Sequence, residues 1–229
     1  RRYIIVYISA FLLVSPGIHA QIAGISCCDW MMLKRQKLGQ FQLMKDIGGD
    51  GVEMDMGPLG RRVMFENRFR DNDKETTQFR QTAERLGIRV SSIAMSGFFA
   101  QTLIDRKFDE QTLADGTKVC KEHTASESDA NYRSLIADCL NTMEAFGAKV
   151  AFLPLGGSGR EWQKGEGPEY EVLCSRLHTF GEMAHKRGLT IGIRTDMPAA
   201  FSKRMLDDIN SSGIKIYYNF QDACDRFKA

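Results

Sequence analysis

Short apolar runs alternate with longer amphipathic stretches along most of this chain. Six short runs are apolar or rich in β-branched residues, as is typical of buried strands. They cover residues 22–28, 51–55, 88–95, 148–155, 189–195 and 214–220. The longer stretches predict helices at residues 40–47, from near 72 to 86, and at 126–146, 168–187 and 199–209. Strands that alternate with helices indicate βαβ units and a parallel sheet.

Three of the predicted helices carry an apolar stripe that should face the core. Apolar residues recur three or four positions apart, as Phe79, Ala83 and Leu86; as Tyr132, Ile136, Cys139 and Met143; and as Leu173, Leu177, Phe180 and Ala184. A glycine lies between each predicted helix and the next strand, and four of these five glycines directly follow the helix, as is common just past a helix end. Residues 96–124 are mostly polar and predict a long irregular loop with a turn at Asp115-Gly116. A loop of that length is usually functional or mobile.

Six strands with intervening helices fit either an open doubly wound sheet or part of an eight-stranded barrel. No G-x-G-x-x-G pattern follows the first predicted strand, which disfavours a dinucleotide-binding sheet. A complete (β/α)8 TIM barrel needs about 250 residues. We therefore interpret residues 21–229 as a TIM-barrel domain of which six strands are present, cut from a longer reading frame.

The N-terminal stretch has the features of a targeting segment. Arg1 and Arg2 precede an apolar run over residues 3–15, and Ile18-His19-Ala20 is an acceptable cleavage site. This pattern predicts a secretory signal peptide over residues 1–20 and a periplasmic or secreted mature protein. The alternative is a membrane anchor, but the run is shorter than the about 20 residues of a spanning helix.

Charge and cysteine content narrow the classes of function. The chain has 31 Lys and Arg against 29 Asp and Glu, a net charge of +2 at pH 7, which indicates no nucleic-acid surface. The six cysteines of an exported chain could form disulfides, but their spacing matches no zinc site or disulfide scaffold. Cys139 and Cys174 lie on predicted helices and are expected to be buried thiols.

Polar residues alternate with apolar ones on three of the predicted strands. Ile191 and Ile193 share one face of the fifth strand and leave Arg194 on the other. The same alternation leaves Glu53 and Asp55 opposite the apolar face of the second strand, and Asn219 opposite that of the sixth. The apolar faces should meet the helices, so we expect these four polar residues at the carboxyl-terminal mouth of the barrel, where such folds bind substrates. The alternative is that Glu53 or Asp55 caps the loop that follows.

Other residues are weaker candidates. The run Trp30-Met31-Met32 could wall a substrate pocket or could simply pack in the core. The loop 156–160 could cradle a phosphate with backbone amides, but it lacks the Lys and Ser/Thr of a P-loop, which favours a flexible loop. His178 and His185 are seven residues apart on one helix, too far for paired metal ligation, and His123 in the long loop could reach the mouth.

Five runs of residues carry a family resemblance. They are 49–53 (Gly-Asp-Gly-Val-Glu), 94–98 (Ala-Met-Ser-Gly-Phe), 138–143 (Asp-Cys-Leu-Asn-Thr-Met), 151–156 (Ala-Phe-Leu-Pro-Leu-Gly) and 214–220 (Ile-Lys-Ile-Tyr-Tyr-Asn-Phe). Each run is weak alone, but their order resembles the xylose-isomerase-like TIM-barrel superfamily. Within it the chain is most similar to the sugar phosphate isomerase/epimerase branch, which includes secreted members.

The resemblance implies a divalent metal (Mn, Co, Zn or Mg) at the mouth, held by carboxylates and a His. The metal would polarise a sugar carbonyl while Glu side chains move a proton between adjacent carbons. It implies a catalytic role for Glu53 and for position 194, and metal ligation by Asn219. Their predicted places at or near the mouth make Asp55, Trp30 and Asn219 our candidates for substrate contacts. The family usually has Glu at position 194 and Asp at position 219. The last His and Glu would lie on strands seven and eight.

Arg194 reverses a charge where the family has a metal ligand, and a guanidinium neither coordinates a cation nor acts as a base near neutral pH. Three explanations stay open: a rare variant or misread codon, a relative without catalysis, or an Arg194 that pairs with Glu53 or Asp55 and binds an anionic sugar without metal. Our first hypothesis is an exported sugar or sugar phosphate isomerase or epimerase. The alternative is a non-catalytic carbohydrate-binding relative. Export and near-neutral charge disfavour a third, an endonuclease-like repair enzyme on the same barrel.

Overall fold

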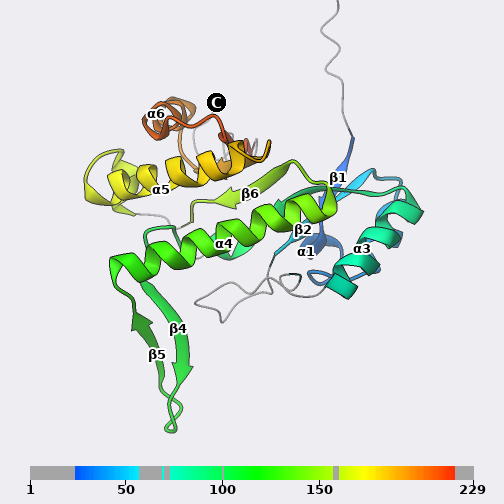
Figure 1. Ribbon diagram of the computed structural model, residues 1–229, viewed down its shortest axis with the longest axis horizontal. Helices are drawn as coiled ribbons and strands as arrows, with labels where there is room; N and C mark the ends of the chain where they lie inside the picture. Colours follow the sequence, from blue (N-terminus) through cyan, green and yellow to red (C-terminus); the bar gives the residue numbers. More distant parts are fainter. Residues whose placement is uncertain (1–23, 57–68, 70–72, 100, 157–159, 220–229) are drawn as a thin grey trace, which may run out of the picture.

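The computed structural model describes residues 24–56, 69, 73–99, 101–156 and 160–219 (Figure 1). The predicted signal peptide, residues 1–20, lies outside these ranges. Among the described residues, no helix combines the length and the apolar character that crossing a membrane requires.

Six strands form one parallel sheet in the order β1-β2-β3-β6-β7-β8. Their bounds are β1 Ser26–Cys28, β2 Gly51–Asp55, β3 Arg89–Ala94, β6 Val150–Pro154, β7 Thr190–Arg194 and β8 Ile214–Ile216. Sequential strands are neighbours, so every crossover runs the same way around the sheet, as in a barrel. The predicted parallel sheet of six strands is confirmed, and β1 and β8 are its edge strands within the described part of the chain.

Helices cover the outer face of this sheet (Figure 1). Their bounds are α1 Asp29–Met32, α2 Gln40–Asp46, α3 Asp73–Leu86, α4 Ala125–Phe146, α5 Pro168–His185 and α6 Ala199–Ile209, with the 3-10 helices η1 Ser96–Phe99 and η2 Glu161–Lys164. All three predicted apolar stripes, on α3, α4 and α5, are buried in the core. The thiols of Cys139 and Cys174 are buried and free, as expected. Periodicity was a sound guide here because these helices bury one face against a sheet.

The prediction of an irregular loop over residues 96–124 was wrong. The segment contains η1 and an antiparallel hairpin of β4 Lys107–Thr112 and β5 Lys118–Glu122, which extends away from the sheet (Figure 1). Its turn is the predicted one: Gly116 has a φ of 83°, and the Asp115 carboxylate accepts from the Thr117 amide at 2.8 Å. The strands escaped detection because they lack the apolar alternation of a strand with one buried face.

The base of the hairpin is tied to the barrel by buried and partly buried hydrogen bonds. The Tyr132 hydroxyl donates to the Thr102 and Asp105 carbonyl oxygens, at 2.7 and 2.9 Å. The Arg160 guanidinium makes two hydrogen bonds to the Asp105 carboxylate, at 2.8 and 3.0 Å. Arg160 therefore has a structural partner. Residues 157–159 of the loop considered for phosphate binding lie outside the described residues.

The two edge strands are shorter than predicted. The first was expected over residues 22–28 and begins at Ser26, and the sixth was expected over 214–220 and ends at Ile216. Tyr218, placed by alternation on the apolar face that should meet the helices, is 64% exposed. An edge strand has a hydrogen-bonding partner on one side only, so its ladder ends sooner than alternation suggests.

Candidate functional site

A buried carboxylate lies on the interior side of the sheet. Glu53 is 5% exposed and comes from the middle of β2. Its Oε1 accepts a hydrogen bond from the Cys28 thiol at 3.1 Å. Its Oε2 accepts from the Ser92 hydroxyl at 2.7 Å and from the Tyr217 hydroxyl at 3.2 Å. Three neutral donors thus converge on one carboxylate, as a buried ionised carboxylate requires.

Strand register brings these groups together. Cys28 is the register partner of Glu53 on β1, and Ser92 is its partner on β3. Parallel partners in register point to the same face, so all three side chains face the interior. Tyr217 directly follows β8, and its side chain lies over Gly192 of β7. A Cβ on Gly192 would lie 3.1 Å from the Tyr217 ring, so the absence of a side chain there lets the ring reach Glu53.

The donors around Glu53 hold their protons near neutral pH. Burial raises the pKa of the Tyr217 hydroxyl, and the adjacent Glu53 carboxylate raises it further. Burial likewise raises the pKa of the Cys28 thiol, with Glu53 adding to the effect. In both cases a negative charge beside Glu53 is unfavourable. The cluster therefore pairs one proton acceptor with donors that remain neutral.

A second polar group lies two residues further along β2, at the mouth. The Asp55 carboxylate is 2% exposed. It forms an ion pair with Arg35 and accepts a hydrogen bond from the Ser96 hydroxyl. The Arg35 guanidinium also lies 5.4 Å from the centre of the Trp30 ring. Trp30 is half-buried, so this arrangement puts an aromatic face, a cation and a carboxylate side by side, a combination suited to sugar hydroxyls.

Aromatic rings fill the interior beside β6, β7 and β8. The Phe152 and Tyr217 ring centres are 4.6 Å apart, and those of Phe99 and Phe152 are 5.7 Å apart. Phe152 is buried, whereas Phe99 is exposed at the mouth. Tyr217 belongs to this stack through its ring and to the Glu53 cluster through its hydroxyl.

Arg194 lies at the mouth beside this aromatic stack. Its Nε is 2.7 Å from Oδ1 of Asp196, and its guanidinium lies 5.4 Å from the centre of the Phe99 ring. The pairing of Arg194 with Glu53 that the sequence allowed is wrong, because Glu53 is held by Cys28, Ser92 and Tyr217 instead. Asp196 is only two residues along the chain from Arg194, in a turn where its φ is 53°.

Asn219 lies near Arg194 rather than near Glu53. Both line a hollow of about 340 Å³ between the end of β7, the start of α6 and the residues after β8. The hollow is mainly apolar, and Lys203 also lines it. The four predicted mouth residues therefore fall into two groups. Glu53 and Asp55 lie on β2, while Arg194 and Asn219 border this second hollow.

The histidines considered from sequence have structural contacts. His123 is buried, and its Nδ1 lies 3.1 Å from the Asn131 amide nitrogen near the base of the hairpin. His178 Nδ1 lies 2.9 Å from the Ile209 carbonyl oxygen. Neither contact involves the Glu53 cluster. His185 is exposed at the end of α5.

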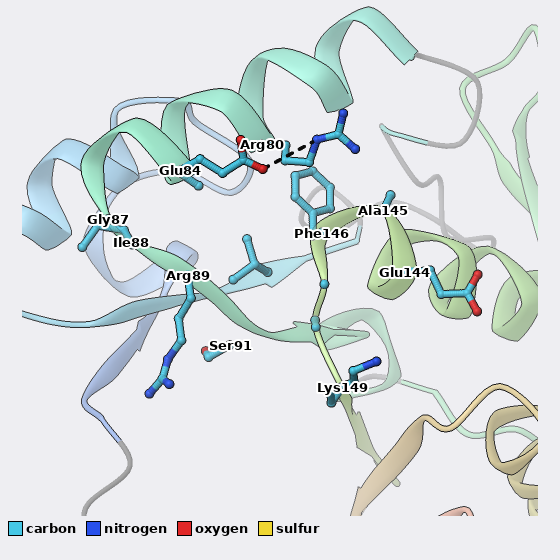
Figure 2. Close-up of a pocket in the computed structure, with 14 residues that line it drawn as sticks. Arg80, Glu84, Gly87, Ile88, Arg89, Ser91, Glu144, Ala145, Phe146 and Lys149 are labelled. Atoms are coloured by element: carbon cyan, nitrogen blue, oxygen red, sulfur yellow. Dashed lines mark ion pairs between the residues drawn. The ribbon is translucent and has the colours of Figure 1, made fainter.

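Another hollow, of about 750 Å³, lies at the opposite ends of the strands (Figure 2). It separates the last turns of α3 and α4. Charged side chains surround it, but Arg80 and Glu84 pair with each other across one helical turn, at 4.0 Å. We assign the site to the other end, since the amino-terminal ends of barrel strands serve stability and the carboxyl-terminal ends carry function.

Sequence reasoning missed Cys28, Ser92 and Arg35 as members of the site. Ser92 could have been found, because it is a polar residue inside an apolar predicted strand. Cys28 offers a weaker signal, since cysteine is as often a core residue. Arg35 carries no signal, because it lies in a polar stretch between α1 and α2 that nothing in the pattern connects with Asp55.

The described residues at the mouth do not fit a divalent cation. No group of three or more His, Cys, Asp or Glu side chains gathers among the residues that the structure describes. Arg194 contributes a positive charge without a lone pair, and Asn219 contributes only a neutral oxygen. The Asp55 carboxylate is already paired with Arg35.

Solved structures with the same fold include enzymes that act on sugars. The 3-keto-D-glucoside 4-epimerase from E. coli is 13% identical, with a TM-score of 0.57 over 84% of this chain and 66% of that one. D-psicose 3-epimerase is 11% identical, with a TM-score of 0.56 over 83% of this chain and 61% of that one. A protein from Mycobacterium smegmatis, solved with magnesium, is 12% identical, with a TM-score of 0.55 over 83% and 62%.

This chain spans less than two thirds of the length of each of those structures. Identities this low establish a shared fold and no more. No curated protein matches this chain in sequence. A sequence profile described as xylose isomerase-like TIM barrel matches residues 41–226, most of the chain. The predicted barrel fold is therefore confirmed, and the chain belongs to the xylose isomerase-like TIM barrel family.

Proposed function

We propose that this protein acts on a small sugar or sugar phosphate as an isomerase or epimerase, with Glu53 as the group that moves a proton between adjacent carbons. The observation that carries the proposal is the buried Glu53 carboxylate with its three neutral donors on the interior face of the sheet. Family membership and the sugar epimerases that share the fold support it.

In this proposal Glu53 abstracts a proton from the carbon next to a carbonyl group. A positioned carboxylate of this kind contributes about 10² to 10⁴ in rate. The Tyr217 hydroxyl remains protonated near neutral pH because burial and Glu53 raise its pKa. If a bound sugar displaces its hydrogen bond to Glu53, the hydroxyl can donate instead to a sugar oxygen that gains negative charge as the proton leaves. Trp30, Arg35 and Asp55 would bind and orient the sugar.

No step of this proposal passes through a metal ion, because the described donor set does not fit one. Arg194 and Asn219 stand where the family resemblance implies Glu and Asp ligands. A guanidinium can still bind a negatively charged group of a sugar, and stacking against Phe99 holds it in place. The proposed substrates therefore include sugars with a phosphate or carboxylate group.

A second candidate function is carbohydrate binding without catalysis. Arg194 favours it, since the residue at this position cannot act as a ligand or base. The two functions share the sugar site and differ only in proton transfer. An experiment that detects proton abstraction separately from binding therefore separates them.

The test is solvent hydrogen exchange. The protein is incubated in D₂O with a panel of ketoses and their phosphates, and deuterium incorporation next to the carbonyl is followed by NMR, with EDTA and with added Mn²⁺. We expect exchange for at least one sugar, and at least a 100-fold loss in Glu53→Gln. Sugar-dependent thermal stabilisation without exchange would select the binding function, and the absence of both would overturn the proposal.

A matched control is Glu84→Gln. Glu84 is an exposed carboxylate beside the hollow at the opposite end of the strands (Figure 2). The substitution is chemically identical to Glu53→Gln, and we expect it to leave exchange unchanged. Thermal unfolding of both variants establishes that any loss of exchange does not reflect loss of fold.

We also propose that residues 1–20 direct export and are removed. The basic pair, apolar run and Ala20 cleavage site support this. N-terminal sequencing of protein from the periplasm or the medium would then begin at Gln21. Protein that retains residues 1–20 in the membrane fraction would contradict cleavage and favour an anchor.

A further inference from the structure

We infer that Asp29 is a positioning residue, whose ionised carboxylate sets Arg35 against Asp55 at the mouth of the barrel. The inference rests on the proposed function only in taking Arg35 and Asp55 as sugar-contacting groups. Asp29 is the first residue of α1, directly after β1. It is fully buried and has no direct access to a substrate.

One carboxylate oxygen of Asp29 holds two segments of backbone together. Oδ2 accepts a hydrogen bond from the Gln36 amide at 2.9 Å and another from the Asp55 amide at 3.2 Å. The Asp55 amide is at the end of β2, and the Gln36 amide is in the segment between α1 and α2. Asp29 therefore ties that segment to the strand that carries Glu53 and Asp55.

The tied segment is the one that presents Arg35. Gln36 has a φ of 53°, a left-handed conformation that a non-glycine residue holds only when its surroundings enforce it. The Gln36 side-chain amide also donates to the Asp55 carbonyl oxygen at 2.6 Å. These contacts hold Arg35, the preceding residue, in its ion pair with the Asp55 carboxylate and against the face of the Trp30 ring.

The second oxygen of Asp29 distinguishes this residue from an ordinary structural carboxylate. Oδ1 is buried and accepts no hydrogen bond from any described protein group. A buried carboxylate with one unsatisfied oxygen favours its protonated form. Burial raises the pKa of Asp29 to about 6, although both backbone amides oppose the rise. Protonation removes the charge that strengthens the two hydrogen bonds.

Three ionisable groups face Asp29 from the neighbouring elements. Asp55 on β2 raises its pKa, and Arg35 after α1 lowers it. Cys28 on β1 is adjacent, but burial and Glu53 keep its thiol protonated well above neutral pH. Asp29 itself has a pKa raised to about 6, mainly by burial. Acidification through that range should therefore weaken the hold on Arg35 and change the environment of Trp30.

Fluorine NMR of protein labelled with 5-fluorotryptophan tests this directly. The chain has two tryptophans. Trp162 is fully buried and serves as an internal reference, and Trp30→Phe assigns the two resonances. We expect the Trp30 resonance to move with a midpoint near pH 6, and the Trp162 resonance to stay in place.

Two variants separate charge from hydrogen bonding. In Asp29→Asn the side-chain oxygen can still accept from both amides, but the charge is gone. We expect the Trp30 fluorine resonance of this variant to keep, at every pH, the chemical shift that the unsubstituted protein shows at low pH. Asp29→Ala removes the acceptor and should shift the Trp30 resonance at every pH. The control Glu84→Gln should leave the midpoint of the Trp30 transition near pH 6.

A Trp30 transition that survives in Asp29→Asn would overturn the inference, because another group would then cause it. An unchanging Trp30 resonance between pH 4.5 and 8 in the unsubstituted protein would overturn it as well. The measurement uses no sugar. A negative result therefore leaves the proposed function standing, and failure of the exchange assay does not affect this test.

Discussion

The two halves of the barrel interior are built on different principles. The polar half, next to β1, β2 and β3, consists of Cys28, Glu53, Ser92, Asp55 and Arg35, which satisfy one another by directed hydrogen bonds and an ion pair. The aromatic half, next to β6, β7 and β8, consists of Phe99, Phe152 and Tyr217, which contact one another through ring faces and edges. Only Tyr217 belongs to both, since its hydroxyl reaches Glu53.

This difference predicts different tolerance to substitution. A buried charge that loses its partner keeps its full desolvation cost, so the polar half should respond sharply to changes that preserve shape. Aromatic contacts depend on volume and area, so the aromatic half should accept other apolar side chains of similar size. Measuring the free energy of unfolding of variants in each half tests that contrast.

Arg35→Ala should be the most destabilising of these changes. Asp55 is 2% exposed, and without Arg35 its carboxylate would stay buried after losing this ion pair. We expect a loss of about 3 to 5 kcal/mol in the free energy of unfolding, measured by urea denaturation. The double variant Arg35→Ala/Asp55→Asn should recover part of that loss. If Arg35→Ala lost less than 1 kcal/mol, the pair would not be buried in solution.

The pH dependence of the free energy of unfolding should reveal the raised pKa of Asp29. Its pKa is about 6 in the folded chain, against an ordinary value of 3.8, so the folded state takes up a proton first as the pH falls. Ionised Asp29 thus destabilises the fold above pH 6, and this cost is relieved between pH 6 and 4. Relative to Asp29→Asn, the unsubstituted protein should gain about 2 kcal/mol over that interval. Parallel stability curves for the two proteins would contradict the assignment.

Ser92→Ala should cost about 2 kcal/mol, the usual contribution of a buried hydrogen bond to a charged group. It removes the 2.7 Å hydrogen bond to Glu53 and leaves the Cys28 and Tyr217 donors in place. The matched control is Ser91→Ala, which changes the next residue on β3, one that borders the hollow at the opposite end of the strands. Equal effects of the two changes would mean that Glu53 does not depend on its donors.

Phe152→Leu should cost only about 1 kcal/mol, because an apolar side chain of similar volume replaces the ring. The change is made in the buried centre of the aromatic half. Thermal unfolding of Phe152→Leu and of Ser92→Ala, measured side by side, compares the stability lost in the two halves. A loss for Phe152→Leu larger than that for Ser92→Ala would mean that the aromatic half is the less tolerant of the two.

Arg194→Gln should have the smallest effect on stability, under about 1 kcal/mol, because its ion pair with Asp196 is partly exposed and screened by solvent. Its effect on ligands should be larger, with weaker binding of any anionic sugar found in the exchange assay. Mn²⁺ should not raise the melting temperature of the unsubstituted protein. Metal-dependent stabilisation would contradict our interpretation of Arg194.

The sequence alone determined the layered architecture and the orientation of the strands. Helix and strand periods are local properties, so alternation correctly placed Glu53 and Asp55 on β2, with Val52 and Met54 in the core. The parallel sheet followed from the regular succession of strands and helices. The hairpin β4–β5 could not be anticipated in this way, because it has no apolar face to create a pattern.

Only the tertiary structure decided which side chains meet. Glu53 and Tyr217 are 164 residues apart, and their contact depends on strand order and on the missing side chain of Gly192. One of the three explanations left open for Arg194 paired it with Glu53 or Asp55, but the turn after β7 supplies Asp196 two residues away. Asp29 was not noticed at all, because its role arises from two backbone amides that folding brings to one oxygen. Periodicity reports which face a residue occupies, whereas its partners depend on distances between strands that no local pattern encodes.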